Sequence, residues 1–224
     1  MSSRIEYERE MQNLHNDMIR LGSMVETALA KSSVALRDRD RDLCHEVIKG
    51  DDDIDQLVEK LDRDCVLLIA RQQPVASDLR DITANLKLST DLERMADHAE
   101  DICEIILHML DFGEEIEIPA EIFQMIEVCR NMTGMAMDSY VMRSKEKSQA
   151  VISMDDEVDT LYANNRKLLM KLMKDNSEQV DSYASLLTIS KHIERFADHA
   201  ENVAGWVIYY LEGRFDIKDE LEKM

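Results

Sequence analysis

The sequence predicts an all-α protein of two tandem three-helix bundles, that is, six long antiparallel helices with an internal duplication. Only 5% of the 224 residues are aromatic, and six glycines and two prolines are too few turn-forming residues for a β-protein of this length. Residues that favour helices, chiefly Leu, Met, Ala, Glu, Lys and Arg, dominate instead. Apolar residues recur at spacings of three and four, and one fifteen-residue segment returns in similar form in the second half.

The first half of the chain predicts three helices. A first helix from about residue 5 ends at the alternating charge block 37–42, and a second is expected over 41–71. Pro74 ends the second helix, because proline cannot continue a helix, and a third reaches about residue 111. The buried face of the first helix is marked by Met11, Leu14, Met18, Leu21, Val25 and Ala28.

The second half repeats this layout. After a linker over 113–119 a fourth helix begins, a fifth is expected over 144–174, and a sixth ends near Glu212, with Gly213 as its stop. The segment LSTDLERMADHAEDI at 88–102 aligns with ISKHIERFADHAENV at 189–203 and is identical at eight of fifteen positions. We therefore predict one three-helix domain over residues 1–114 and a second over 115–224.

Charge and cysteine use limit the function classes. A formal net charge of −20 repels nucleic acid and anionic lipid, so neither is an expected ligand, whereas cations and basic partner surfaces are attracted. Four scattered cysteines without a CxxC pair predict buried thiols in a reducing cytoplasm. No apolar run is long enough to span a bilayer, so we expect a cytoplasmic protein without membrane insertion.

Acidic pairs at i and i+4 mark the second and third helix of each half, where such residues share one helix face. Folding the first hairpin about residues 73–74 brings residue 53 level with residue 94. Folding the second hairpin about residues 176–177 brings residue 157 level with residue 196. Four carboxylates then converge in each half. They are Asp51, Asp55, Glu93 and Asp97 in the first half, and Asp155, Asp159, Glu194 and Asp198 in the second.

Converging carboxylates repel one another unless a hard or borderline cation compensates them, so the pattern predicts two all-oxygen metal sites. The alternative is an ordinary solvated acidic face. Arg94 and Arg195 are expected as counter-charges, while His98 and His199 are expected as polar packing residues, with metal ligation as the other option. Surrounding acidic or amide groups are Asp52, Glu100 and Asp101 in the first half, and Asp156, Glu201 and Asn202 in the second.

The segments 73–80, 91–102 and 193–202 resemble the hallmark of PhoU proteins, and the resemblance extends over about residues 5–214. It implies two three-helix bundles and E/D-x-x-x-D motifs that bind metal clusters, with iron, zinc, manganese or magnesium as candidates. The four acidic pairs match this motif. Asp97-x-x-x-Asp101 is a fifth match, in the first half. The second half has Asn202 at the position equivalent to Asp101, so the two metal sites are expected to differ in charge.

The resemblance also implies a negative regulator of the phosphate-starvation response and modulator of a phosphate ABC transporter. Such a protein would contact the transporter's ATPase subunit and a sensor histidine kinase, as a homodimer, at the inner face of the cell membrane. No nucleotide-binding loop or nucleophile motif points to an enzyme. The alternatives are a carboxylate-bridged metalloenzyme, in which paired metals activate water, and a metal store.

Overall fold

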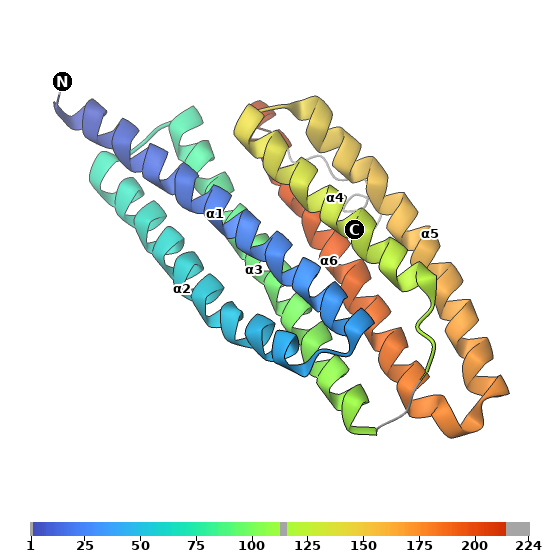
Figure 1. The fold of residues 1–224 in the computed structure, drawn as a ribbon. Helices are drawn as coiled ribbons and strands as arrows, with labels where there is room; N and C mark the ends of the chain where they lie inside the picture. Colours follow the sequence, from blue (N-terminus) through green and yellow to red (C-terminus); the bar gives the residue numbers. More distant parts are fainter. Residues whose placement is uncertain (1, 113–115, 214–224) are drawn as a thin grey trace.

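The computed structural model describes residues 2–112 and 116–213, and within them it has six α-helices and one short 3-10 helix (Figure 1). The predicted all-α fold class is confirmed. The expected domain boundary at 114/115 falls among residues 113–115, outside the described ranges. The helices are α1 Ser2–Asp38, α2 Arg41–Gln72, α3 Ser77–Phe112, α4 Ala120–Met142, α5 Lys145–Asp175, η1 Ser177–Gln179 and α6 Val180–Glu212.

Local sequence explains where these helices begin and end. The Asp40 side chain accepts a hydrogen bond from the Leu43 amide at 3.0 Å and so caps the start of α2. Ser144 caps α5 in the same way. Gln73 adopts a left-handed conformation with φ of 46°, and this residue turns the chain out of α2 just before Pro74. A side-chain oxygen therefore caps the start of the second helix in each half, α2 and α5.

The two halves pack side by side along α3 and α6, which occupy the middle of the molecule (Figure 1). In each half the three helices contact one another as a bundle, and α1 also contacts α4 across the two halves. We refer to the α3–α6 interface as the seam. Because 88–102 on α3 and 189–203 on α6 are the duplicated segments, the seam joins two copies of the same helix.

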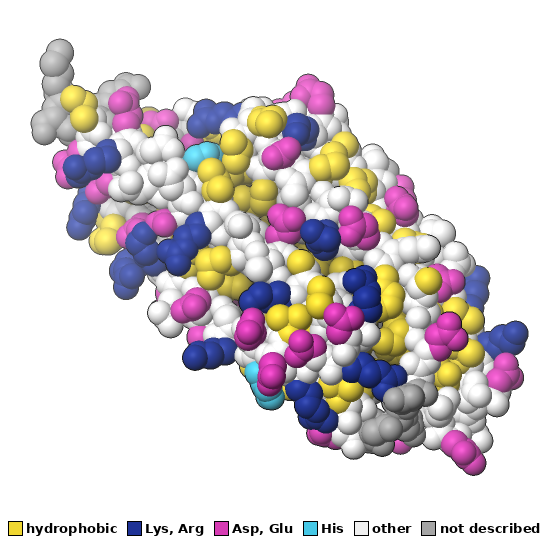
Figure 2. Space-filling model, in the orientation of Figure 1, with side chains coloured by type: hydrophobic (Ala, Val, Ile, Leu, Met, Phe, Trp, Pro, Cys, Tyr) yellow, Lys and Arg dark blue, Asp and Glu magenta, His cyan; other side chains and the backbone are white. Residues whose placement is uncertain are grey.

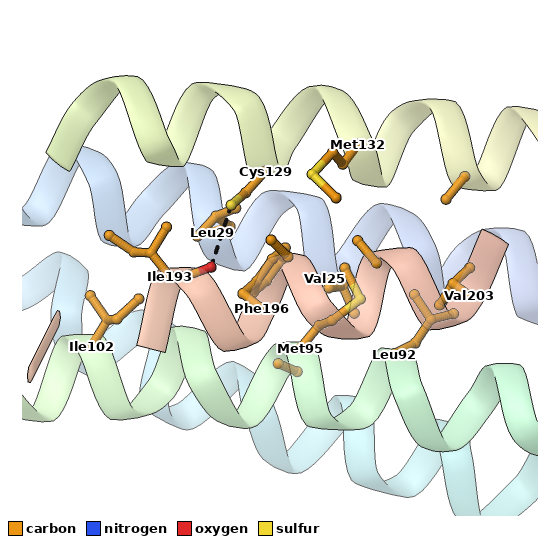
Figure 3. Close-up of a cluster of buried hydrophobic side chains, with 14 of the residues drawn as sticks. Val25, Leu29, Leu92, Met95, Ile102, Cys129, Met132, Ile193, Phe196 and Val203 are labelled. Carbon is orange, nitrogen blue, oxygen red and sulfur yellow. Dashed lines mark hydrogen bonds between the residues drawn. The ribbon is translucent and has the colours of Figure 1, made fainter. Parts of the chain in front are cut away.

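A continuous apolar core extends across the seam (Figure 3). Phe196 on α6 and Met95 on α3 occupy equivalent repeat positions, and both are fully buried. Leu29 from α1 and Met132 from α4 pack in the same cluster (Figure 3). The four cysteines are free thiols and all are buried, as the sequence predicts. Burial of a large apolar side chain such as Phe196 or Met95 contributes about 1.5–3 kcal/mol to stability. Because both halves supply such side chains to one core, they stabilise one another.

The end of α6 is held by the first half of the chain. Arg80, from the hallmark segment that opens α3, donates from Nε to the Tyr210 carbonyl oxygen at 3.1 Å. Gly213 ends α6 with φ of +73°, which confirms it as the predicted helix stop. A Cβ atom at Gly213 would lie 2.6 Å from Nη1 of Arg80, at the end of a flexible side chain, so it is the positive φ rather than this contact that favours glycine.

Charged side chains of both signs are interspersed over the face of the molecule shown in Figure 2, with hydrophobic side chains visible between them. Despite the net charge of −20, this face is therefore not one uniform acidic patch. Among the residues that the structure describes, no helix combines the length and apolar character needed to cross a membrane.

Candidate metal-binding clusters and the helix seam

Three carboxylates of the first half meet between α2 and α3. The ligand oxygens of Asp51, Asp55 and Asp97 lie within 4.8 Å of one another, and we call this group the first acidic cluster. The helical hairpin places these residues at one level, as the sequence arithmetic predicts. Asp51 is only 9% exposed, whereas Asp55 lies at the solvent edge. The cluster therefore extends from the packed interior to bulk water, which leaves an entry path for a cation.

The first acidic cluster resists full ionisation. Burial, followed by the charges of Glu100 and Asp55, raises the pKa of Asp51 to about 7. Burial and the neighbouring Asp97 also raise the pKa of Asp55. Glu93 behaves alike, because burial and Asp97 raise its pKa while Arg94 opposes the shift. At neutral pH Asp51 is therefore partly protonated, and a cation among these carboxylates would favour its ionised form.

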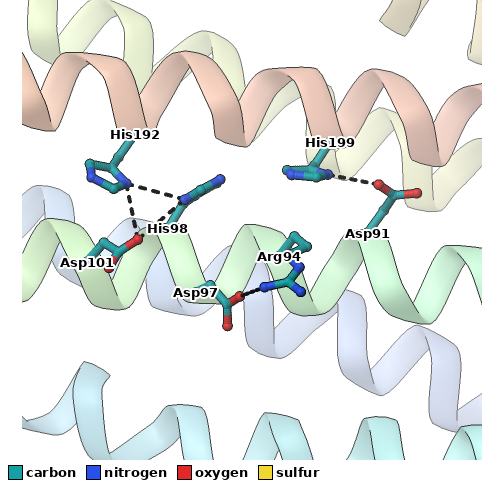
Figure 4. A network of polar contacts seen from close by, with 7 residues as sticks. All are labelled: Asp91, Arg94, Asp97, His98, Asp101, His192 and His199. Carbon is teal, nitrogen blue, oxygen red and sulfur yellow. Dashed lines mark hydrogen bonds and ion pairs between the residues drawn. The ribbon is translucent and has the colours of Figure 1, made fainter.

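Two predicted neighbours of the cluster have distinct roles. Arg94 donates from Nη1 to Asp97 at 2.9 Å, so it is the expected counter-charge (Figure 4). Asp52 lies exposed beside Asp51 and contributes to the rise in the Asp51 pKa. In Figure 4 Arg94 and Asp97 point away from α6, on the side of α3 that faces α2. One arginine thus offsets only part of the negative charge collected there.

The second half places the equivalent carboxylates between α5 and α6. Burial, followed by Glu201 and Asp198, raises the pKa of Asp155 to about 7, with smaller effects of Asp159 and Glu194. Burial and Glu194 raise the pKa of Asp198 to about 6, against the opposing charge of Lys191. These side chains act on one another's pKa, and we call Asp155, Asp159, Glu194 and Asp198 the second acidic cluster. Unlike in the first cluster, no three of their ligand oxygens lie within 4.8 Å of one another.

The two clusters are not equivalent in charge. Lys191 forms an ion pair with Glu194 in the second cluster, and its repeat equivalent in the first half is the uncharged Thr90. Arg195 and Asp156, both predicted as neighbours, are exposed. The second cluster therefore carries a built-in ammonium group that a cation would have to compete with. The first cluster has no lysine at that position and fits a divalent cation better.

The donor set suits hard and borderline cations. Carboxylate oxygens alone favour Mg²⁺, Mn²⁺ or iron over softer ions that prefer thiolate or imidazole. The raised pKa values of Asp51 and Asp155 agree with cation binding, because a bound cation stabilises the ionised carboxylate that burial disfavours. Neither cluster presents a nucleophile beside a base.

Two of the predicted ligands lie elsewhere. Asp101 turns toward the seam rather than toward the first acidic cluster (Figure 4). Asn202 likewise faces the seam, where its Nδ2 donates to Asp91. The reason is the helical period: residue 101 lies about 40° round the helix from Asp97 and about 60° from His98, between the two faces. Spacing alone could not decide which face it joins.

The seam instead gathers a group of two histidines and one carboxylate. The Nδ1 atoms of His98 and His192 are 3.3 Å apart, and Oδ2 of Asp101 lies 3.5 Å from the first and 3.2 Å from the second (Figure 4). We call these residues the seam trio. Burial and the neighbouring imidazoles lower the pKa of His98, and burial lowers that of His192. His192 was not predicted, because its repeat equivalent is Asp91 and the residue lies outside the identical motif.

The equivalent positions of the other repeat hold a different group. Asp91 on α3 accepts hydrogen bonds from Nδ1 of His199 at 2.8 Å, from Nδ2 of Asn202 at 3.3 Å and from Nε1 of Trp206 at 2.8 Å. His199 is thus the polar packing residue that the sequence predicts. We call this group the Asp91 network. Its position mirrors the seam trio, since each repeat position differs from its partner by 101 residues.

Two tandem three-helix bundles, joined along duplicated helices that carry matching acidic pairs, define a duplicated helical scaffold with candidate cation sites. The PhoU domain model matches residues 18–106 and 122–207, which include both halves of the chain. The chain therefore belongs to the PhoU family.

Curated relatives align over nearly the whole chain. The phosphate-specific transport system accessory protein PhoU homolog of Clostridium acetobutylicum is 34% identical over 215 residues, which cover 95% of this chain and 98% of that protein. The homolog of Aquifex aeolicus is 35% identical, with 92% of each chain covered. PhoU of Escherichia coli is 27% identical, with 98% of this chain and 92% of that protein covered.

Two solved structures share the fold. The phosphate transport system regulatory protein PhoU of Streptococcus pneumoniae superimposes with a TM-score of 0.87 at 27% identity, covering 94% of this chain and 99% of that one. PhoU of Pseudomonas aeruginosa gives a TM-score of 0.89 at 28% identity, covering 93% and 100%. The two-bundle arrangement is therefore shared along the full length of both structures.

Proposed function

We propose that this chain is an accessory and regulatory protein of a phosphate-specific transport system. The observation that carries the proposal is the match of both halves to the PhoU domain, together with relatives that align over nearly their full length. The curated relatives described above are named as accessory proteins of such a system, and the Streptococcus pneumoniae structure as a regulatory protein.

The regulation that we propose is negative. When phosphate is plentiful, the protein helps to keep phosphate-starvation genes off by contacting the transporter's ATPase subunit and a sensor histidine kinase. It works in the cytoplasm as a homodimer, held at the inner face of the cell membrane by these partners. A net charge of −20 supports docking to basic protein surfaces and disfavours direct contact with DNA.

Cations bound at the acidic clusters have a structural role in this proposal. Asp51, Asp55 and Asp97, with Glu93 beside them, would hold a cation between α2 and α3. Asp155, Asp159, Glu194 and Asp198 would do so between α5 and α6. The bound ion removes the repulsion between carboxylates and so fixes each hairpin, which presents a rigid docking face to the partners.

Gene deletion tests the regulatory function. In phosphate-replete medium the deletion strain should show high alkaline phosphatase activity, and the wild-type gene should restore repression. Unchanged low activity in the deletion strain would contradict negative regulation. A gene that encodes Asp97→Asn with Asp198→Asn tests the clusters, and Asp53→Asn, at an exposed aspartate of α2, is the matched control. Repression restored by the control alone supports a need for the clusters.

Partner contacts need a separate measurement. The purified protein is mixed with the purified ATPase subunit or the kinase's cytoplasmic part, and binding is followed with sedimentation velocity. A complex with either partner supports the proposed contacts, and the same experiment on the protein alone reports whether it is a dimer. Absence of both complexes, with and without Mn²⁺, would leave the docking mechanism unsupported.

A further inference from the structure

We infer that the seam trio, His98, Asp101 and His192, is a binding site for a transition-metal ion such as Zn²⁺, separate from the two acidic clusters. The inference goes beyond the proposed function and does not depend on it. It rests on the geometry of three donor atoms, on the comparison between the repeats and on the chemistry of imidazole.

The donor atoms are spaced as a tetrahedral metal requires. Zinc binds histidine nitrogen and carboxylate oxygen at about 2.0–2.2 Å, so donors at tetrahedral angles lie about 3.3–3.5 Å apart. The three separations in the trio are 3.3, 3.5 and 3.2 Å. The three separations therefore match the edges of one face of a zinc coordination tetrahedron.

A hydrogen-bonded trio explains this arrangement less well. In a hydrogen-bonded trio one Nδ1–H faces the unprotonated Nδ1 of the other imidazole, so this single N–H is shared between that nitrogen and Oδ2 of Asp101. A cation among the three atoms uses the lone pairs of both nitrogens and the charge of the carboxylate at once. Imidazole and carboxylate together favour Zn²⁺, Co²⁺ or Ni²⁺ over Mg²⁺.

The seam trio has two packed imidazoles and one carboxylate that reaches solvent. The side chains of His98 and His192 are 12% and 17% exposed, and that of Asp101 is 43% exposed. The packed imidazoles are held by α3 and α6, while the carboxylate reaches solvent. A water molecule can therefore take the fourth metal position. Since His98 and His192 belong to different halves, a bound ion would link the two halves across the seam.

The duplicated chain supplies its own comparison. In the Asp91 network the positions of the trio hold His199, Asn202 and Asp91, so one imidazole faces an amide and a carboxylate. Asp91 there accepts three hydrogen bonds, and its oxygens are engaged by donors. The trio replaces that acceptor with a second imidazole and replaces the amide with a carboxylate. Both changes turn a hydrogen-bonded group into a metal-ligand set.

Cobalt titration of the metal-free, full-length protein tests the inference. Co²⁺ is added in the presence of excess Mg²⁺, which occupies all-oxygen sites, and visible absorption is recorded. Tetrahedral Co²⁺ absorbs far more strongly than octahedral Co²⁺, so binding at the trio is distinguished from binding at carboxylate clusters. We expect intense bands that saturate at one Co²⁺ per chain and disappear on addition of Zn²⁺.

Three variants assign the signal. His192→Asn keeps a donor for Asp101 but removes the imidazole, and it should weaken Co²⁺ binding at least about tenfold. Asp101→Asn should act in the same direction and carries the test if the first variant does not fold. His45→Asn, at an exposed histidine of α2, is the control and should keep the wild-type spectrum. Far-UV circular dichroism checks that each variant is helical.

Two results would overturn the inference. The first is a wild-type spectrum with only weak octahedral bands, which would make the trio a packing group. The second is an intense spectrum that survives in both His192→Asn and Asp101→Asn, or that is lost equally in His45→Asn, which would place the metal elsewhere.

Discussion

Trp206 on α6 donates from its indole Nε1 to Oδ2 of Asp91 on α3 at 2.8 Å, so this hydrogen bond crosses the seam between the two halves. The Asp91 side chain is only 13% exposed and accepts two further hydrogen bonds from α6. One carboxylate of the first half thereby satisfies three donors of the second half, which fixes how far α3 and α6 can slide past each other.

Loss of Asp91 should destabilise the protein more than loss of any one of its donors. Asp91→Ala leaves three partly buried donors without their acceptor and should lower the free energy of unfolding by about 2–3 kcal/mol. Trp206→Phe keeps the ring packing and removes one hydrogen bond, so about 1 kcal/mol is expected. Urea denaturation measures both values. Thr90→Ala, at an exposed position of α3, should change stability little, and equal losses in all three variants would contradict the assignment.

Phe196 tests the shared core. It is fully buried where helices of both halves meet, so Phe196→Ala should lower the free energy of unfolding by about 3–5 kcal/mol. Phe196→Met, which copies the residue at the equivalent position 95, should cost under about 1.5 kcal/mol. A single cooperative unfolding transition is expected for each variant, monitored with circular dichroism. Two separate transitions in the wild-type protein would show that the halves unfold independently.

Glycine substitutions should have opposite effects at two positions. Gly213→Ala places a Cβ at positive φ and 2.6 Å from the Arg80 guanidinium, and a loss of about 1–2 kcal/mol is expected. Gly134→Ala lies inside α4 with open space around the new Cβ, so it should stabilise the protein by about 0.5–1 kcal/mol. Thermal unfolding compares the two. Stabilisation by Gly213→Ala would contradict the need for glycine at this helix end.

The metal-free protein should lose stability as the pH rises from about 4 to about 7. In this range folded Asp51, with its pKa near 7, binds a proton more often than the unfolded chain, whose aspartates titrate near 4. The folded state is therefore favoured at the acidic end of the range. Urea denaturation at several pH values measures the slope, and added Mn²⁺ should restore stability at pH 8.

Asp51→Asn isolates this effect from other titrations. At pH 8 the metal-free variant should be more stable than the wild type by about 1–3 kcal/mol, because a buried charge is removed. At pH 4.5 the difference should be small, and the stabilisation by Mn²⁺ should shrink. Asp53→Asn removes the same charge at an exposed position and serves as the control. A variant less stable than wild type at pH 8 would argue against repulsion in the first acidic cluster.

Much of this architecture could be predicted from the sequence. The three-and-four spacing of apolar residues and the duplicated segment are strong local signals, so helix bounds were predicted to within a few residues. The level at which Asp51 meets Asp97 followed from helix rise and the position of the turn alone. Both inferences need only geometry within one hairpin.

What failed was the part that depends on packing between halves. Asp101 lies between two helix faces, and only the docking of α3 on α6 turns it toward His192. A second miss is local: Lys191 pairs with Glu194 within α6, and spacing alone does not show this because i, i+3 neighbours can also extend into solvent. Contacts across about a hundred residues leave no periodic trace in the sequence, so the seam trio became visible only in three dimensions.

The seam also has a consequence for how the molecule assembles. Two copies of one helix facing each other form the interface expected of a symmetric two-subunit protein, except that here a linker joins the partners. Covalent joining makes the encounter intramolecular, so pairing of the halves does not depend on protein concentration. It also frees the chain from symmetry. A substitution in one subunit of a true homodimer appears twice, whereas here Asp91 and His192 could diverge at equivalent positions and acquire separate tasks.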